Sequence, residues 1–216
     1  AWIAYVHQPD PKVWAGKSDI LVIAAAGGSP KNLTAEFRDS AGAGVKWSPD
    51  GKNLYWHSQE GLFHHIFRVP ASGGKIAHIT EGNRMHNDFD LARDGNKAVV
   101  LADPGTAPAD VWSLDLNGSG GGRNRISNAN PQMDEFAIAK AEPVRWKGPD
   151  DLDVEGLLTY PLDYTPGKKV PLILNIHGGP YGAHSGRFDS RAQIFAANGY
   201  AVLAPNPRGS TGYGMK

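Results

Sequence analysis

The residues with the clearest chemical potential are the glycines of the segment 173–182, which reads Ile-Leu-Asn-Ile-His-Gly-Gly-Pro-Tyr-Gly. An apolar run at 170–176 leads into them and predicts a buried parallel strand. Glycine has no Cβ, so a substrate can approach the main chain closely at Gly178 and Gly179. Pro180 offers no N–H and stiffens the exit. The two glycine N–H groups could therefore donate to a negatively charged oxygen, as in an oxyanion hole. A tight strand-to-loop turn without chemistry is the alternative.

Further secondary-structure elements are expected to position Gly178 and Gly179. Residues 154–160 and 200–205 predict two more strands, and 190–198 predict an amphipathic helix. Strand, helix and strand with short joints form a βαβ unit, so the strands at 170–176 and 200–205 should be parallel. Arg208 follows the last strand, at the carboxyl end where ligands bind in open α/β sheets. It could orient a substrate carbonyl or the loops of the site, or it could bond only to neighbouring backbone.

An internal repeat runs through the first half of the chain. The segment 20–34, ILVIAAAGGSPKNLT, aligns with 66–80, IFRVPASGGKIAHIT, at an offset of 46 residues (66 − 20). The pairs Asp50-Gly51 and Asp94-Gly95 recur at an offset of 44 residues (94 − 50). Each pair supplies the positive φ that a tight hairpin turn needs. Short strands and Asp-Gly turns at this period are typical of β-propeller blades.

The repeats are too few to close a propeller, which has about four to eight blades. We therefore expect residues 1–135 to be the C-terminal blades of a β-propeller and 136–216 to begin a second domain, with the chain truncated at both ends. The glycine-rich segment 117–131 reads as a swollen loop of the repeat or as a linker. The crossover between the domains is expected at 132–150. A small independent β-sandwich is the alternative to propeller blades.

Composition narrows the possible functions. The 216 residues include 22 basic and 22 acidic side chains, so the net charge is zero, and no basic stripe predicts binding of nucleic acid. No apolar run approaches the roughly 20 residues that span a bilayer, so no membrane partner is expected. The lack of cysteine excludes disulfides and a cysteine nucleophile. We expect no signal peptide in this fragment. The compartment, cytoplasmic or periplasmic, and the oligomeric state stay open.

The histidines and the acidic residues near position 150 are interpreted as structural, not as metal-binding or catalytic. His64 and His65 are adjacent on a predicted strand, so they should point to opposite faces and cannot share one ion. No other histidine spacing predicts a metal site, and we expect no metal and no other cofactor. The acidic residues of 150–155 predict a solvated strand edge rather than a catalytic pair of carboxylates.

The motifs together resemble the prolyl oligopeptidase family, and most of all its branch of acylaminoacyl-peptidases and bacterial dipeptidyl-aminopeptidases. The resemblance rests on the repeat half, on Glu142-Pro-Val-Arg-Trp-Lys, on His177-Gly-Gly-Pro-Tyr-Gly and on Asn206-Pro-Arg-Gly-Ser-Thr-Gly-Tyr-Gly. It implies all-β propeller blades followed by the N-terminal part of an α/β-hydrolase domain. It also implies a serine peptidase whose propeller restricts access to short peptides.

The resemblance assigns roles to a few residues. Gly179 matches the residue whose N–H contributes to the oxyanion hole, and its partner donor in the family follows the nucleophilic serine. The glycine pattern alone adds Gly178 as a further candidate donor. Tyr181 and Arg208 are expected to contact a short peptide substrate. No serine of the chain lies in the G-x-S-x-G motif of a nucleophile elbow. We therefore expect an active parent protein and an inactive chain. The alternatives are a propeller-based binding scaffold with a vestigial hydrolase domain, and an esterase on the same fold.

Overall fold

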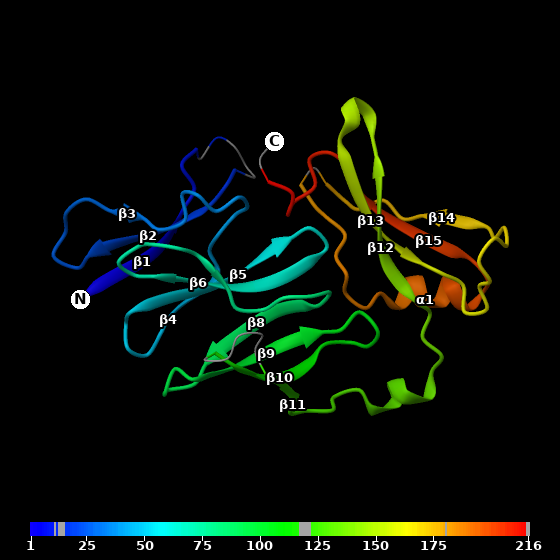
Figure 1. Cartoon of the computed structure of the whole chain (residues 1–216), viewed down its shortest axis with the longest axis horizontal. Coiled ribbons are helices and arrows are strands. Elements are labelled where there is room, and N and C mark those ends of the chain that lie inside the picture. Colours follow the sequence, from blue (N-terminus) through cyan, green and yellow to red (C-terminus); the bar gives the residue numbers. More distant parts are fainter. Residues whose placement is uncertain (11, 13–15, 117–121, 180, 215–216) are drawn as a thin grey trace.

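Short β-strands make up most of the regular structure (Figure 1). The computed structural model describes residues 1–10, 12, 16–116, 122–179 and 181–214. Within these ranges there are fifteen strands, two 3₁₀ turns, at Pro131–Glu135 and Pro149–Asp151, and one α-helix, α1 (Ser190–Ala197). No helix of the described ranges has the length and hydrophobicity that crossing a membrane requires.

Three antiparallel meanders follow one another in the first part of the chain. Meander A comprises β1 (Trp2–His7), β2 (Asp19–Ala24) and β3 (Lys31–Asn32). Meander B comprises β4 (Ala43–Trp47), β5 (Asn53–Glu60), β6 (Phe63–Pro70) and β7 (Ala77–His78). Meander C comprises β8 (Met85–Leu91), β9 (Lys97–Asp103), β10 (Asp110–Asp115) and β11 (Arg123–Arg125). The predicted Asp-Gly turns are confirmed, because Gly51 and Gly95 have φ of 69° and 72°.

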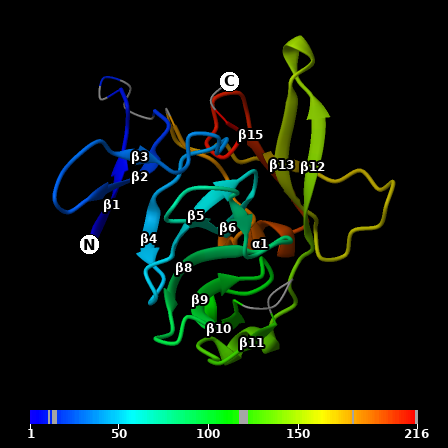
Figure 2. The same ribbon diagram turned by 60° about the vertical axis from the view of Figure 1, so that its left-hand side comes forward.

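Meander B lies between the other two and packs against both. Along β5, Leu54 and Trp56 face meander A, whereas Tyr55 between them faces meander C. On β6, Phe67 stacks on Trp56 with ring centroids 5.5 Å apart, and both side chains are fully buried. Figure 2 shows the three meanders following one another as layers. One parallel bridge, between His64 of β6 and Met85 of β8, joins meanders B and C into an eight-stranded sheet. Whether these layers are blades of a closed propeller stays a prediction.

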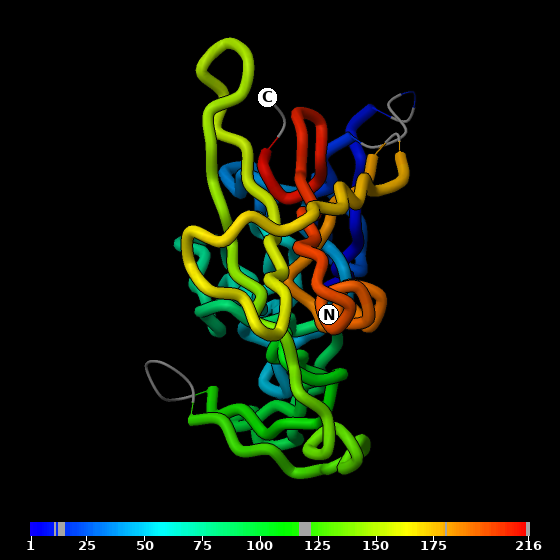
Figure 3. The backbone as a smooth tube through the Cα atoms, turned by 90° about the vertical axis from the view of Figure 1, so that its right-hand side faces the viewer, coloured from blue at the N-terminus to red at the C-terminus, as the bar shows by residue number. Residues whose placement is uncertain are grey.

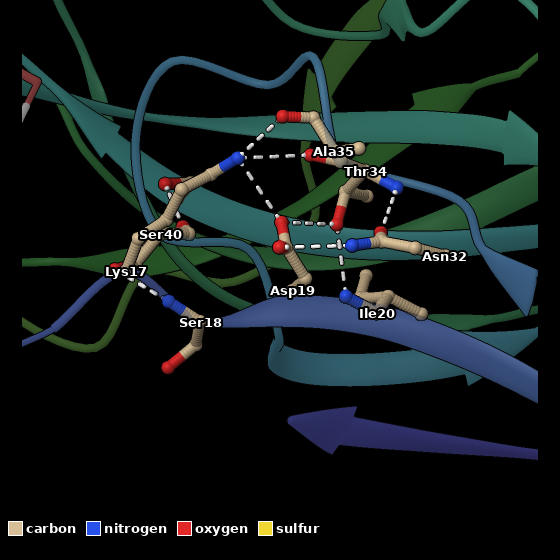
Figure 4. A network of polar contacts seen from close by, with 9 residues as sticks. Lys17, Ser18, Asp19, Ile20, Asn32, Thr34, Ala35 and Ser40 are labelled. Atoms are coloured by element: carbon tan, nitrogen blue, oxygen red, sulfur yellow. Dashed lines mark hydrogen bonds and ion pairs between the residues drawn. The ribbon is translucent and has the colours of Figure 1, made fainter. Parts of the chain in front are cut away.

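A hydroxyl hydrogen bond repeats in all three meanders and explains the spacing of the sequence repeat. The amide of Ile20 donates to Thr34 Oγ1 (2.8 Å), that of Ile66 to Thr80 Oγ1 (2.9 Å), and that of Val111 to Ser127 Oγ (3.0 Å). In meander A the Thr34 hydroxyl donates to Asp19, which also binds Asn32 and Lys17 (Figure 4). In each meander the hydroxyl thus ties the segment after the last strand to the strand before it, which is β2, β6 or β10.

The second part of the chain is a mixed four-stranded sheet. Its strands are β12 (Ala141–Lys147), β13 (Asp153–Thr159), β14 (Leu172–Leu174) and β15 (Ala201–Asn206), in the order β12-β13-β15-β14. β14 and β15 are parallel and α1 connects them, so the predicted βαβ unit is confirmed. The segment 132–150, expected as a crossover, contains β12, which pairs with β13 over seven residues. In Figures 1 and 3 the β12–β13 turn projects at the opposite end of the molecule from β11.

Two predictions about burial are wrong. The run 170–176, expected as a buried strand, forms only the short edge strand β14, and Leu172, Leu174 and Ile176 are 57%, 55% and 69% exposed. The helix exposes Ile194 and Phe195 and buries two small residues, Ala192 and Ala196. Apolar residues on one face of a sheet or helix become buried only where another layer covers that face.

The β5–β6 hairpin joins the two parts. Its tip, residues 60–63, lies against the loops around Gly186 and Gly212. The Gly61 amide donates to the Gly212 carbonyl, and the Gly186 amide donates to the Leu62 carbonyl, both at 2.7 Å. A Cβ on Gly186 would lie 2.2 Å from the Phe63 ring, so only glycine allows this approach. Asp103 adds a further bond, since it accepts from the Phe188 amide.

We expect Phe67→Ala to lower the free energy of unfolding by about 3–5 kcal/mol, because it removes a fully buried aromatic ring between two layers. Val99→Ala is the control, since Val99 lies on β9 and is 44% exposed. It should cost less than about 1 kcal/mol. Urea unfolding followed by tryptophan fluorescence measures both. Equal losses would contradict the layer arrangement.

Candidate functional site

The predicted oxyanion corner follows directly after β14. The Asn175 amide still pairs with the Leu203 carbonyl of β15, and the chain then leaves the sheet at His177, Gly178 and Gly179. The loop after β15 returns to the same place. His177 Nε2 lies 3.0 Å from Ser210 Oγ, and the Thr211 amide donates to the Gly182 carbonyl. The corner is therefore held between the ends of two parallel strands.

The orientation of the Gly178–Gly179 peptide gives this corner its chemical potential. His177 Nδ1 lies 2.8 Å from the Gly178 carbonyl oxygen, and since a carbonyl can only accept, Nδ1 carries the proton. A Cβ at Gly182 would lie 2.4 Å from the same oxygen. In a trans peptide the N–H points opposite to the C=O. The Gly179 N–H is consequently directed away from His177 and Gly182.

The two glycine amides are available as donors. Gly178 and Gly179 are both exposed, and neither N–H donates to another of the described residues. A cleft of about 440 Å³ adjoins Gly178, and its lining also includes Asn175, His177 and His184. The Gly178 backbone thus lies at the rim of a cleft, and the donor role of Gly178 and Gly179 toward an oxyanion stays a prediction.

A hydrogen-bonded network supports the corner from behind. Asn206, at the end of β15, exchanges hydrogen bonds with the backbone of His184, and His184 Nε2 donates to the Asn175 carbonyl at 2.8 Å. Burial lowers the pKa of His184, which keeps this ring neutral. Asn206 also binds the Tyr213 hydroxyl, which donates to Glu155 at 2.8 Å.

Glu155 corrects one prediction. The acidic residues 150–155 were expected to form a solvated edge, but Glu155 is only 6% exposed. It binds Arg145 Nε at 2.9 Å on one side and Tyr213 on the other, and its carboxylate packs against Gly61 of the hairpin. Burial, together with this acceptor, raises the pKa of Tyr213 well above its usual range, so its hydroxyl stays a donor.

The predicted substrate-binding residues lie farther out. Arg208 follows β15 as expected, and its guanidinium forms an ion pair with Asp150 at 3.0 Å. Tyr181 is half exposed beside the glycines. Pro180, predicted to stiffen the exit, and 117–121, part of the predicted swollen loop, lie outside the described residues. Contact of Arg208 or Tyr181 with a substrate stays a prediction.

Sequence reasoning missed the supporting residues Ser210, Tyr213, Asn206 and His184. Three of them lie in the segment 206–214, a motif in which the sequence analysis gave a role only to Arg208. Their partners lie up to 58 positions away, as for Tyr213 and Glu155, so no local spacing indicates them. Among the described residues, no group of three potential metal ligands converges.

Comparisons with known proteins show that the chain is similar to part of several peptidases. It is 29% identical to the probable dipeptidyl-peptidase 5 of Aspergillus clavatus over 99% of its own length and 30% of that protein's. The acylaminoacyl peptidase of Pyrococcus horikoshii has the same fold over 99% of this chain and 32% of its own, with a TM-score of 0.81 and 22% identity. An acylaminoacyl peptidase in complex with Z-Gly-Gly-Phe-chloromethyl ketone matches equally well, with 23% identity. No family model matches.

The chain is thus homologous to a segment of peptidases. More specifically, it corresponds to part of dipeptidyl-peptidase 5 and of acylaminoacyl peptidase, and it spans about 30% of the length of these relatives.

We expect Gly212→Ala to weaken the contact between the hairpin and the loop after β15. Gly212 has a φ of +87°, and an added Cβ would lie 2.9 Å from Gln59 Cγ and 3.1 Å from the Gly61 carbonyl oxygen. Gly209→Ala is the matched control, because Gly209 has a φ of +90° and nothing within 4 Å. Both variants lose about 1–2 kcal/mol through the backbone conformation.

Gly212→Ala should lose about 1–3 kcal/mol more through the clash. Urea unfolding of both variants measures the difference. Equal losses would show that the hairpin does not press against this loop.

Proposed function

We propose that this chain is part of a serine-type peptidase of the prolyl oligopeptidase family. In this peptidase, residues 1–135 are propeller blades and 136–216 begin an α/β-hydrolase domain. The Gly179 N–H stabilises the oxyanion that forms when a serine attacks a peptide carbonyl, and Gly178 lies beside it as a second donor. The observation that carries this proposal is the orientation of the Gly178–Gly179 peptide, with its carbonyl bound by His177 and its N–H directed outward.

The chemistry also needs a nucleophile, which has to come from sequence outside these 216 residues, since no G-x-S-x-G motif occurs within them. Attack of that serine on the carbonyl carbon forms an acyl-enzyme and releases the amine, and water then releases the acid. Oxyanion donors lower the barrier of both steps because the charge on the oxygen develops only in the transition state.

The similarity to dipeptidyl-peptidase 5 and to acylaminoacyl peptidase supports short peptides as the substrate class. The peptide-like inhibitor bound to one of these homologues supports the same choice. The longer protein that contains this chain should therefore react with a fluorophosphonate probe and cleave peptide anilides. Labelling by the probe, together with turnover of p-nitrophenyl esters but not of peptide anilides, would indicate an esterase. An unlabelled protein would instead be a binding scaffold.

Gly179→Pro tests the backbone donor in that longer protein, because proline has no N–H. We expect kcat to fall about 10²- to 10³-fold with little change in KM, as for loss of one oxyanion donor. Gly179→Ala is the matched control. It keeps the N–H, and its Cβ would meet no atom closer than the Tyr181 nitrogen at 3.8 Å.

The alanine variant should retain activity within about threefold, and circular dichroism should show both variants folded. Equal activity of the proline and alanine variants would exclude the Gly179 amide as an oxyanion donor.

A further inference from the structure

Meander B differs from its neighbours at one equivalent position. This position directly precedes the residue whose amide donates to the Thr or Ser hydroxyl. It is Asp19 in meander A and Asp110 in meander C, but His65 in meander B. Both carboxylates accept a hydrogen bond from the hydroxyl, and both are nearly buried. His65 occupies the same place, is 8% exposed, and its Nδ1 has no partner among the described residues.

The residue that binds the carboxylate has changed as well. Asn32 donates to Asp19 at 3.0 Å, and Arg125 Nε donates to Asp110 at 2.8 Å. At the corresponding position meander B has His78, whose ring centroid lies 6.2 Å from that of His65. A carboxylate paired with polar or cationic partners has thus been replaced by two adjacent imidazoles.

Two groups of rings, on opposite faces of β6, form what we call the histidine cluster: His65 with His78 and His86 on one face, and His57 with His64 on the other. The His65 and His86 ring centroids are 5.9 Å apart, and those of His57 and His64 are 6.1 Å apart. His86 is fully buried, and its Nδ1 lies 2.9 Å from the His64 carbonyl. Buried nitrogens of His57, His64 and His86 have no partner among the described residues.

We propose that the histidine cluster makes the contact between the two parts of the molecule sensitive to acid: protonation of the cluster loosens meander B and releases the β5–β6 hairpin from the loops at Gly186 and Gly212. The hairpin tip, residues 60–63, directly precedes His64 and His65 on β6. A charge on either ring therefore acts within a few residues of the bonds that join the two parts.

Charged groups on the strands and loops next to the histidine cluster make protonation of its rings easier or harder. Glu60 on β5 and Glu81 after β7 favour protonation of His65, whereas Arg123 on β11 opposes it. Arg84, before β8, and Arg123 both oppose protonation of His86. Asp88 on β8 favours protonation of His57.

Burial is the largest effect for each of these rings. It lowers the pKa of His57 and His65, and it lowers the pKa of His64 and His86 to about 4.

The sign of the effect follows from these values. A histidine of the unfolded chain has a pKa of about 6.5. Since the folded values of His64 and His86 are about 4, the unfolded state binds more protons between pH 6.5 and 4. The stabilisation is fully present above pH 6.5 and is lost as the pH falls toward 4. Within this window, each buried histidine that stays neutral in the folded state increases the equilibrium constant of unfolding about tenfold for every unit by which the pH falls.

The test measures urea unfolding of the 216-residue chain between pH 7.5 and 4.5. His65→Asp restores the carboxylate found in meanders A and C, and His86→Gln removes a buried imidazole while keeping a side-chain donor. We expect both variants to lower the pH dependence, His86→Gln by up to about one factor of ten per pH unit. His7→Gln, at an exposed position on β1, should leave it unchanged. Unchanged dependence in both cluster variants would overturn the proposal.

A second measurement needs no variant. Hydrogen exchange of the Gly61 and Gly186 amides reports the hairpin bonds directly, because both donate across the contact. Their protection factors should fall at least tenfold from pH 7 to 5, while those of the β5 amides next to Leu54 fall less. Equal loss of protection in both regions would show general unfolding in place of local release of the hairpin, and loss in neither would show that acid does not release it; either result would overturn the proposal. Titration of the His64 and His86 ring protons above pH 6 in the folded chain would also refute the proposal.

Discussion

The structure depends on the insertion of one hairpin into two glycine loops. The tip of β5–β6 leaves no room for a side chain at Gly186, and its backbone groups bond to Gly212 and Gly186. The loop that contains Gly212 also carries Ser210, which holds His177, and His177 fixes the Gly178 carbonyl. The orientation of the candidate oxyanion donor thus depends on a contact made by the first part of the chain.

Local features of the fold could be predicted from the sequence, whereas long-range features could not. Asp50-Gly51 and Asp94-Gly95 determine their turns through the conformational freedom of glycine, so the meander spacing is visible in the sequence. The hydroxyl bonds of Thr34 and Thr80 explain why both residues end the aligned segments. The burial of Glu155 depends on Arg145 and Tyr213, and its acidic neighbours gave the opposite indication.

For the candidate site, the sequence indicated residue types but not the orientation of their groups. Residues 178 and 179 are both glycines and follow an apolar run, and this pattern indicated a pair of backbone donors. The direction of an N–H cannot be read from a sequence, because it depends on what binds the adjacent carbonyl. Here that partner is His177, which the sequence analysis named only as the first residue of the motif His177-Gly-Gly-Pro-Tyr-Gly. Its own support from Ser210 crosses 33 positions.

The edge position of β14 has a consequence for handling the isolated chain. Leu172, Leu174 and Ile176 present an apolar stripe beside a row of backbone groups on the open side of the sheet. Such an edge is a template on which another strand can add. A concentrated preparation of these 216 residues is therefore prone to form intermolecular β-sheet. Lysine at position 174 would oppose this aggregation by placing charge on the stripe.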